Sequence, residues 1–373
     1  MMKKGWEIKK IGDVADIVHG KNQKDVVSAH GKYPIYGSGG TVMGYATEYL
    51  CPAGTTILGR KGTINNPQYI NHKFWNVDTA FGIVAKDSID SKYLFFFIKK
   101  QDWSKMNTGT TLPSLTQTIV KNVEIPLPPL SEQKEIVEHL DSSFAKIDTL
   151  KANAAKNLDE AKALFQSALK DALEPKKGWE EKILKDICTH IVDCPHSTPP
   201  KSDTPTEYPF IRTSDLKQGK ISWDVMQYVS KEEYHKRNAR ITPQKNDIIY
   251  GREGTFGDAA LLPEYPYFCL GQRVVLLRSN IEIVNPEFLL YTVISPFVYS
   301  QAKNKNMGCG VGHVNVADIK RFKMFIPPLS EQQEIVSRLD SLNEKVNTLQ
   351  QNYSRICSEC DAMKQAILRQ VFE

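Results

Sequence analysis

Apolar residues recur in steps of three and four along two long stretches of this chain, which start at Ser131 and Ser330. Neither stretch contains Pro or Gly, and both serines are suitable N-caps. The pattern predicts two helices of about 44 residues, or roughly 65 Å at 1.5 Å per residue. The first apolar seam holds Val137, Leu140, Phe144, Ile147, Lys151, Ala154, Leu158, Ala161, Phe165, Ala168 and Ala172; the second holds Leu339, Leu342, Val346, Leu349, Tyr353, Ile356, Cys360, Met363, Ile367 and Gln370.

The rest of the chain has a different pattern. Residues 1–130 and 175–327 contain short apolar runs, many of them β-branched, separated by turn signals such as Gly39-Gly40. These features are typical of mixed α+β domains. We therefore expect four segments: a first module (1–130), a helix (131–174), a second module (175–327) and a second helix (328–373).

The two halves are copies of one unit. Residues 128–133, Pro-Pro-Leu-Ser-Glu-Gln, recur as residues 327–332, and 21 of the 47 positions from there to residues 174 and 373 are identical. Upstream, Gly-Trp-Glu at residues 5–7 recurs at 178–180, and the Gly-Arg-x-Gly-Thr turn at 59–63 recurs at 251–255. The offsets imply 19 extra residues before the second turn and 7 after it.

An apolar stripe must be covered, and two arrangements of the long helices do this. The helices can pack on each other as an antiparallel coiled coil, which the short connection from Pro175 to Gly178 favours. Alternatively, each helix can pack on its own module. The first arrangement is the expected one.

Composition narrows the class of protein. The chain has 373 residues, 41% of them hydrophobic, with 7 Cys, which excludes a collagen, a disordered polymer and a disulfide scaffold. The first module carries a net charge of +6 and its helix −3; the second module carries +4 and its helix −2. Basic modules joined to acidic helices suit contact with phosphates, although similar charge occurs on proteins that bind no nucleic acid.

The expected location is the cytoplasm, with reduced thiols. No stretch approaches the roughly 18 apolar residues of a membrane span. The basic start of the chain is followed by no apolar run of the kind that signal peptides contain.

Catalytic and metal signatures are weak. No glycine-rich stretch lies in a strand-to-helix context that would bind a cofactor, so we expect no enzyme activity and no cofactor in this chain. Cys188, His190, Cys194 and His196 have some character of a zinc set. The polar run around His196 is instead typical of an exposed loop, and no metal site is expected.

Polar and basic loops are the better candidates for function. Arg in a Gly-flanked turn can donate two hydrogen bonds to a guanine edge, although such a turn can also be a hairpin with solvated charges. The basic residues after His235 suit a phosphate clamp or a solvated surface. The DNA-binding candidates are Tyr36, Ser38, Arg60, Lys61, Thr63, His196, Ser197, Thr198, Arg212, Ser214, Arg237, Arg240, Arg252 and Thr255.

These residues together carry a resemblance to a known family. Two divergent modules, each beginning with Gly-Trp-Glu and ending in Pro-Pro-Leu-Ser-Glu-Gln before a long helix, resemble the specificity subunit of type I restriction-modification systems. The likeness covers essentially the whole chain, and the Asp-Cys-Pro-His-Ser-Thr-Pro run at residues 193–199 is similar to a target-recognition module of that family.

The resemblance implies function and partners. Each module would read one half of a bipartite double-stranded DNA target, and the helices would set the gap and dock two methyltransferase subunits, with restriction subunits joining the full complex. S-adenosylmethionine, ATP and Mg would belong to those partners. The expected partner-binding residues are Ser131, Glu132, Gln133, Ser330, Glu331 and Gln332. The alternative is a coiled-coil scaffold that binds no specific DNA sequence.

Overall fold

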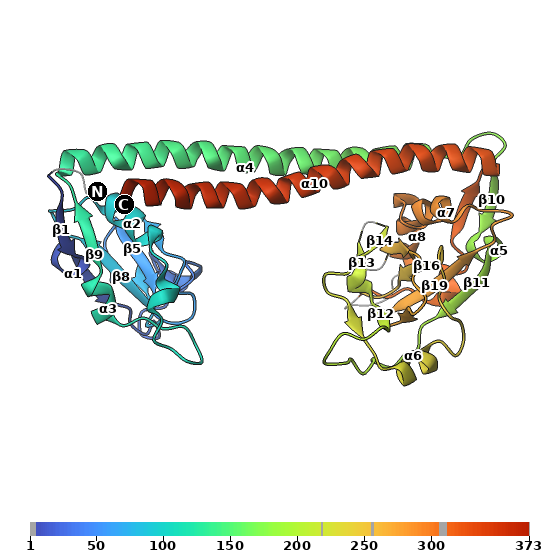
Figure 1. The fold of residues 1–373 in the computed structure, drawn as a ribbon, viewed down its shortest axis with the longest axis horizontal. Coiled ribbons are helices and arrows are strands. Elements are labelled where there is room, and N and C mark those ends of the chain that lie inside the picture. The colour runs from blue at the N-terminus through green and yellow to red at the C-terminus, as the bar shows by residue number, and fades with distance from the viewer. Residues whose placement is uncertain (1–4, 218, 255–256, 306–311, 373) are drawn as a thin grey trace. The chain divides into compact units, whose positions relative to one another are not determined.

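The computed structural model describes residues 5–217, 219–254, 257–305 and 312–372 (Figure 1). Contacts divide the chain into two compact units. The first unit comprises Met1–Ala155 with Tyr353–Glu373, and the second comprises Lys156–Asn352. Each unit therefore contains one module together with one end of each long helix.

The first unit has nine described strands. They are β1 (Glu7–Lys10), β2 (Ala15–His19), β3 (Tyr33–Tyr36), β4 (Val42–Ala46), β5 (Thr55–Gly59), β6 (Gln68–Ile70), β7 (Trp75–Asn76), β8 (Ala80–Ala85) and β9 (Glu124–Leu127). Its helices are α1 (Ile11–Val14), α2 (Ser91–Lys100), the 3-10 turn η1 (Trp103–Met106), α3 (Gln117–Asn122) and the start of α4 (Leu130–Ala172).

The second unit continues the numbering. Its described strands are β10 (Glu180–Ile183), β11 (Cys188–Asp193), β12 (Pro209–Ile211), β13 (Leu216–Lys217), β14 (Lys220–Ile221), β15 (Gln227–Tyr228), β16 (Ile248–Gly251), β17 (Ala259–Leu261), β18 (Cys269–Leu270), β19 (Val274–Ser279) and β20 (Lys323–Ile326). Its helices are α5 (Leu184–Ile187), η2 (Thr213–Asp215), α6 (Lys231–Arg237), α7 (Pro286–Val293), α8 (Pro296–Lys305), α9 (Val316–Ile319) and the start of α10 (Leu329–Phe372).

The two modules share one topology. A four-stranded antiparallel sheet has the order β2-β8-β5-β6 in the first and β11-β19-β16-β17 in the second. A three-stranded sheet has the order β4-β3-β7 in the first and β15-β12-β18 in the second, with one parallel pair in each. Antiparallel ladders β1-β9 and β10-β20 join the two ends of each module. The mixture of helices and strands confirms the predicted α+β class. The matching strand orders of the two modules confirm the duplication.

The second module is longer because it carries elements that the first lacks. The β13-β14 hairpin and α6 lie between β12 and β16, where the sequence offsets place the 19 extra residues. Helix α8 stands after the second-module helix α7 at the place that η1 occupies after α2. The divergence is thus concentrated in additions around a common pair of sheets.

The long helices begin two residues earlier than the predicted N-caps imply. Helix α4 starts at Leu130 and α10 at Leu329, so Ser131 and Ser330 lie in the first turn and are not the N-caps. The carbonyls of Pro129 and Pro328 accept the first helical hydrogen bonds, over 3.0 Å each. The second proline of each pair therefore takes the capping position.

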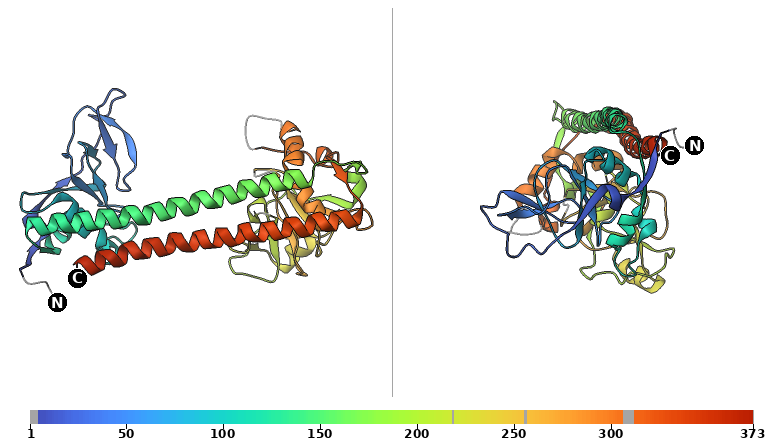
Figure 2. Two further views of the ribbon diagram at one scale, coloured as in Figure 1. Left: turned by 90° about the horizontal axis from the view of Figure 1, so that it is seen from above. Right: turned by 90° about the vertical axis from the view of Figure 1, so that its left-hand side faces the viewer.

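Within the first unit, the beginning of α4 and the end of α10 lie side by side and run in opposite directions (Figure 2). Lys151 Nζ is 2.9 Å from Asp361 Oδ1, and one turn away Lys364 pairs with Asp148. Apolar side chains of both segments join the core of the module, which corresponds to the alternative mode of packing. These side chains are Val137, Leu140, Phe144 and Ile147 of α4 and Cys360, Leu368 and Phe372 of α10.

The second unit repeats this arrangement with the opposite ends of the helices. One core contains the end of α4, the beginning of α10 and the inner face of the β16-β19 sheet. The contributing helix residues are Phe165, Leu169 and Ala172 of α4 and Ile335, Val336, Leu339 and Val346 of α10.

The predicted seam of α10 is partly wrong. Leu349 and Met363 are exposed by 40% and 52%. Near its end α10 buries Leu368 and Phe372, whose spacing is four, because the ring of Phe372 packs on Tyr93 and Phe97 of α2. Near the end of α10, contact with the module therefore determines which residues are buried, and these residues depart from the heptad pattern. In the described residues, no helix has both the length and the apolar composition of a membrane span.

Candidate nucleic-acid interface

The Gly-Arg-x-Gly-Thr turns occupy equivalent places in the two modules. The first follows β5 and the second follows β16, and each is tied to the segment before the last short helix of its module. Leu115 N donates to Arg60 O over 2.8 Å, and Val314 N donates to Arg252 O over 2.9 Å. The correspondence inferred from the sequence is confirmed.

In the first module this turn touches the loop that follows β3. A Cβ atom placed on Gly39 would lie 3.8 Å from Thr63 Oγ1, and one on Gly62 would lie 3.8 Å from Ser38 Oγ. Two glycine-bearing turns thus approach closely and present their polar side chains together. The first loop face is defined as Ser38, Arg60, Lys61 and Thr63.

Arg60 keeps its charge available on this face. Its side chain is half-buried, and Nη1 donates to the backbone carbonyl of Asp78 over 3.1 Å. A carbonyl orients a guanidinium without neutralising it. Lys61 beside it is exposed. The first loop face is therefore polar and positively charged.

Tyr36 does not belong to this face, although the sequence made it a DNA-binding candidate. It is only 8% exposed, and its ring packs edge-on against Phe74 with centroids 5.5 Å apart. Its hydroxyl lies 3.2 Å from Nε2 of His72. We therefore assign Tyr36 to the core. The sequence did not distinguish this role, because an aromatic residue before a turn can serve either packing or recognition.

Arg252 differs from Arg60 in its surroundings. Its side chain is 6% exposed, Nε lies 3.2 Å from Asp193 Oδ1, and Nη1 lies 3.5 Å from Glu253 Oε1. The guanidinium is enclosed and neutralised by carboxylates. This corrects the expectation that Arg252 reaches a guanine edge.

Replacing Arg252 with Ala should destabilise the second module. The change removes the guanidinium beside Asp193, whose side chain is 21% exposed, at an expected cost of about 1–3 kcal/mol. Urea denaturation would show the loss as a lower midpoint, and Lys in place of Arg252 should recover only part of it. Unchanged stability together with relaxed DNA specificity would restore Arg252 as a base reader.

Arg212 and Arg237 also make internal bonds. Arg212 donates to both carboxylate oxygens of Asp215, through Nε over 3.0 Å and Nη2 over 2.8 Å. Arg237 is buried, with Nε 2.8 Å from Glu233 Oε1 and Nη2 donating to Ser197 O over 2.8 Å. These bonds make both arginines structural, which corrects the expectation that they contact DNA.

The loop at residues 196–198 is exposed, as predicted. Arg237 Nη2 donates a hydrogen bond to the backbone carbonyl of Ser197, and Thr198 Oγ1 accepts a hydrogen bond from Gln272 Nε2 over 2.8 Å. His196 Nε2 lies 3.3 Å from Asp193 Oδ2. The second loop face is defined as His196, Ser197, Thr198, Gln272 and Arg273.

The remaining candidates lie apart from these contacts. Ser214 is exposed and its hydroxyl donates to Asp215 Oδ1 over 3.2 Å. Arg240 is exposed after α6. Thr255 lies outside the described residues. For Arg240 and Ser214 a DNA contact stays a prediction.

Sequence reasoning did not single out Gln272, Arg273 and His313, which contact the predicted loops. None belongs to a recognisable motif, and the useful signal is the repeat itself. Backbone pairing makes Arg273 the counterpart of Thr79, because Arg252 N donates to Arg273 O as Arg60 N donates to Thr79 O. An alignment of the two modules by strand pairing would have drawn attention to these positions.

The repeated motifs at the module and helix boundaries contact each other. Trp6 Nε1 donates to Glu132 Oε2 over 3.1 Å, and Trp179 Nε1 donates to Glu331 Oε2 over 3.2 Å. Each Gly-Trp-Glu motif is therefore bound to the first turn of the helix that leaves its module. The sequence placed both motifs at matching positions but did not predict this bond.

The glutamines of these first turns are fully buried. Gln133 Oε1 accepts from Asp90 N over 2.7 Å and its Nε2 donates to Pro128 O over 2.8 Å. Gln332 makes the same bonds with Asn285 N and Pro327 O. The expectation that these two glutamines bind a partner is corrected, because their amides are used inside the module.

The other partner-binding candidates have different surroundings. Ser131 and Ser330 are exposed, and Glu132 and Glu331 are half-buried beside their tryptophans. A partner contact at these four residues stays a prediction.

No metal site is visible in the described residues. They contain no group of three or more His, Cys, Asp and Glu side chains suited to an ion. Burial raises the pKa of the Cys188 thiol to about 12, so this group stays protonated at neutral pH. Among the described residues, the zinc alternative therefore has no structural support.

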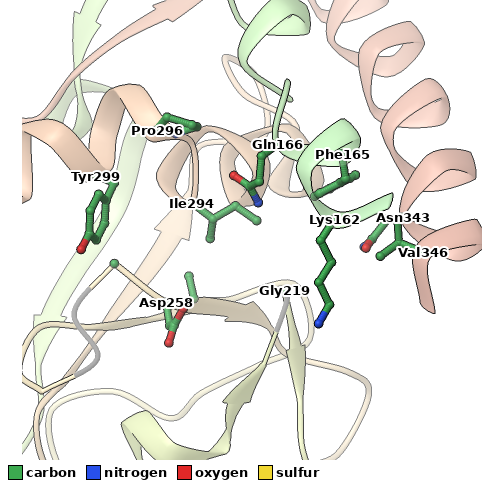
Figure 3. Close-up of a pocket in the computed structure, with 12 residues that line it drawn as sticks. Lys162, Phe165, Gln166, Gly219, Asp258, Ile294, Pro296, Tyr299, Asn343 and Val346 are labelled. Carbon is green, nitrogen blue, oxygen red and sulfur yellow. The ribbon is translucent and has the colours of Figure 1, made fainter. Parts of the chain in front are cut away.

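A cavity of about 400 Å³ lies in the second unit, where α4 and α10 approach the module (Figure 3). Phe165, Ile294 and Val346 supply apolar walls, and the Lys162 side chain extends along the opening toward Gly219. Asp258 and Tyr299 add polar side chains to the lining.

The fold is shared with solved structures of type I systems. One comes from work on the structural basis underlying complex assembly and conformational transition of the type I R-M system; it matches with a TM-score of 0.75 and 18% identity, covering 100% of this chain and 99% of that chain. Another is the HsdS subunit of Thermoanaerobacter tengcongensis, with a TM-score of 0.53 and 18% identity over 100% and 97% of the chains.

The sequence also matches a family model. The chain belongs to the type I restriction modification DNA specificity domain family, whose model matches residues 3–158 and 176–356. A relative from Escherichia coli, the type I restriction enzyme EcoBI specificity subunit, is 24% identical over 352 residues, or 85% of this chain and 72% of that protein. The MjaVIII specificity subunit of Methanocaldococcus jannaschii is 23% identical over 91% and 87% of the two chains. The predicted resemblance to specificity subunits is thus confirmed.

Proposed function

We propose that each module of this specificity subunit reads one half of a bipartite double-stranded DNA target. The observation that carries the proposal is the pair of modules with one topology and different loop faces. Both loop faces offer Ser, Thr and Arg, but the first adds Lys and the second adds His and Gln, so the half-sites should differ. Charged side chains bind phosphates, and polar side chains at the loop tips contact base edges.

The long helices would form an antiparallel coiled coil that sets the gap between the half-sites. Support comes from each unit separately: opposite helix ends pack together, and in the first unit Lys151 and Lys364 pair across them. The length of a stiff spacer, set by its number of helical turns, would determine the distance between the two half-sites along the DNA. The acidic character of the helices suits this role better than DNA contact.

The chain would act without catalytic activity of its own. Two methyltransferase subunits would dock on the helices and restriction subunits would join the complex. S-adenosylmethionine, ATP and Mg would be bound by those partners. Such a complex would work in the cytoplasm, where it meets DNA.

Selection from a random pool of duplexes tests the proposal, using the chain with the partners that co-purify from its own cells. We expect two short conserved blocks separated by a constant gap. Binding should also weaken steeply with salt, because each neutralised phosphate releases a counterion, with a slope of roughly −0.9 per phosphate in the logarithmic plot. Retained partners without enrichment of any DNA would favour the scaffold function instead.

Replacing Arg60 with Ala should affect only one half-site. If Arg60 donates to a guanine, the change should cost about 1–3 kcal/mol on the correct sequence and relax the preference at that position. The neighbouring exposed Lys61, changed to Ala, is the matched control for loss of charge. Equal weakening on every sequence would make Arg60 a phosphate contact.

A further inference from the structure

We propose that Arg273 is the base reader of the second module and that it selects a guanine. This inference rests on the proposed function and assigns a residue to the DNA-binding role that Arg252 cannot perform. Arg273 lies in the short turn between β18 and β19, one residue before β19 begins.

The backbone of Arg273 is unusual. Its φ is +66°, in the left-handed region, where glycine and asparagine are the common residues. Asn246 is the other described non-glycine residue with positive φ, and asparagine tolerates it. Arginine has no conformational advantage at a positive φ. Its presence in this turn therefore indicates a role for its side chain.

Neighbouring backbone fixes the turn tightly. A Cβ atom on Gly271, two residues before, would lie 2.5 Å from Ile211 O, so the chain passes close against β12 there. Arg273 O accepts from Arg252 N over 2.9 Å, and Val274 O accepts from Cys194 N over 3.2 Å. The backbone from which the Arg273 side chain extends is therefore fixed between the Gly-Arg-x-Gly-Thr turn and the 196–198 loop.

Glu253 orients the guanidinium. Arg273 Nε lies 3.3 Å from Glu253 Oε2, while Oε1 of the same carboxylate lies 3.1 Å from His313 Nδ1 and 3.5 Å from Arg252 Nη1. The carboxylate of Glu253 thus contacts Arg252, Arg273 and His313, and it holds the Arg273 guanidinium through Nε. A guanidinium bound through Nε still has its Nη1-Nη2 edge, and this pair of donors matches O6 and N7 of guanine.

Exposure separates Arg273 from Arg252. The Arg273 side chain is 54% exposed, whereas that of Arg252 is 6% exposed. Beside Arg273, Gln272 is bonded to Thr198, so the turn is continuous with the exposed 196–198 loop. The first module has Thr79 at the equivalent position, so the two modules present different chemistry at this point.

Two substitutions of Arg273 test the proposal in the duplex selection described above. Gly at this position removes the side chain and suits a φ of +66°, so the module should fold at least as well as before. Lys keeps the charge but lacks the forked donors. We expect both variants to lose preference for one guanine in one half-site, by roughly 5- to 150-fold, the discrimination of a bidentate pair. The control is Arg338→Ala, which removes one charge from an exposed position on α10.

The outcomes are distinct. If the unaltered chain enriches no bipartite sequence, the proposed function fails. If it does, and Arg273→Gly weakens binding equally on all sequences or leaves both half-sites unchanged, Arg273 is not a base reader. Loss of preference confined to one position, with Arg273→Lys binding duplexes that lack this guanine nearly as tightly as the unaltered chain does, would support the inference.

Discussion

Inserting seven residues into both long helices, after Ala155 and after Ile356, is expected to widen the gap of the DNA target by about three base pairs. Seven residues lengthen a helix by roughly 10 Å, and DNA rises 3.4 Å per base pair. Both half-sites should remain the same, because no residue of either loop face changes. Duplex selection with the altered chain measures gap and half-sites together.

The insertion points face each other if the pairing of the first unit continues along the helices. Lys151 pairs with Asp361 and Asp148 with Lys364, so steps forward along α4 correspond to steps backward along α10. A heptad rotates the downstream face by only about 20° relative to a straight helix, which preserves the apolar seam.

Two controls make this prediction sharp. A heptad in α4 alone should misalign the seam and lower the unfolding temperature without defining a new gap. Four residues in both helices should lengthen them while rotating the buried face, so the gap and the stability should both change. An unchanged gap after the paired heptads would show that the helices do not set the spacing.

Long-range periodicity made the helices and the repeat predictable. The seam from Val137 to Phe165 is buried or half-buried throughout, because local spacing alone determines which helical face is apolar. The prediction failed near the end of α10, where Phe372 packs on rings of α2. That contact joins residues far apart in the sequence, and no periodicity encodes it.

The loop residues were less predictable for a related reason. Arg60 and Arg252 stand in the same motif, yet one faces a carbonyl and the other two carboxylates. The difference depends on Asp193, which reaches Arg252 from another strand. An arginine in such a motif is therefore easily found in the sequence. Whether it has a structural role or contacts DNA depends on its partner, and the partner is determined by the fold.

Replacing Gln133 with Leu is expected to destabilise the first unit by about 2–4 kcal/mol. Gln133 is fully buried and its amide serves three backbone groups, those of Asp90, Pro128 and Ser88. Leucine fills a similar volume but leaves these groups unpaired in the interior, and each unsatisfied group carries a desolvation cost. The exposed neighbour Lys134, changed to Ala, should have little effect.

Gln332 makes the equivalent bonds in the second unit and offers a matched substitution. Because the two sites share no partners, their effects on unfolding should be independent, and each should lower the stability of its own unit. Urea denaturation followed by hydrogen exchange of α2 and α7, whose first residues adjoin these amides, measures the two effects separately. Equal loss of protection in both units after a single change would contradict this independence.

The same substitutions distinguish anchoring from recognition. Gln133 and Gln332 connect each module to the helix that leaves it, and they lie outside both loop faces. A weakened anchor should leave the half-site sequences intact but allow several gap lengths in the selected DNA, because the module can then adopt more than one angle to its helix. Altered half-sites with a single constant gap would show instead that the first turn of the helix shapes the DNA-reading loops.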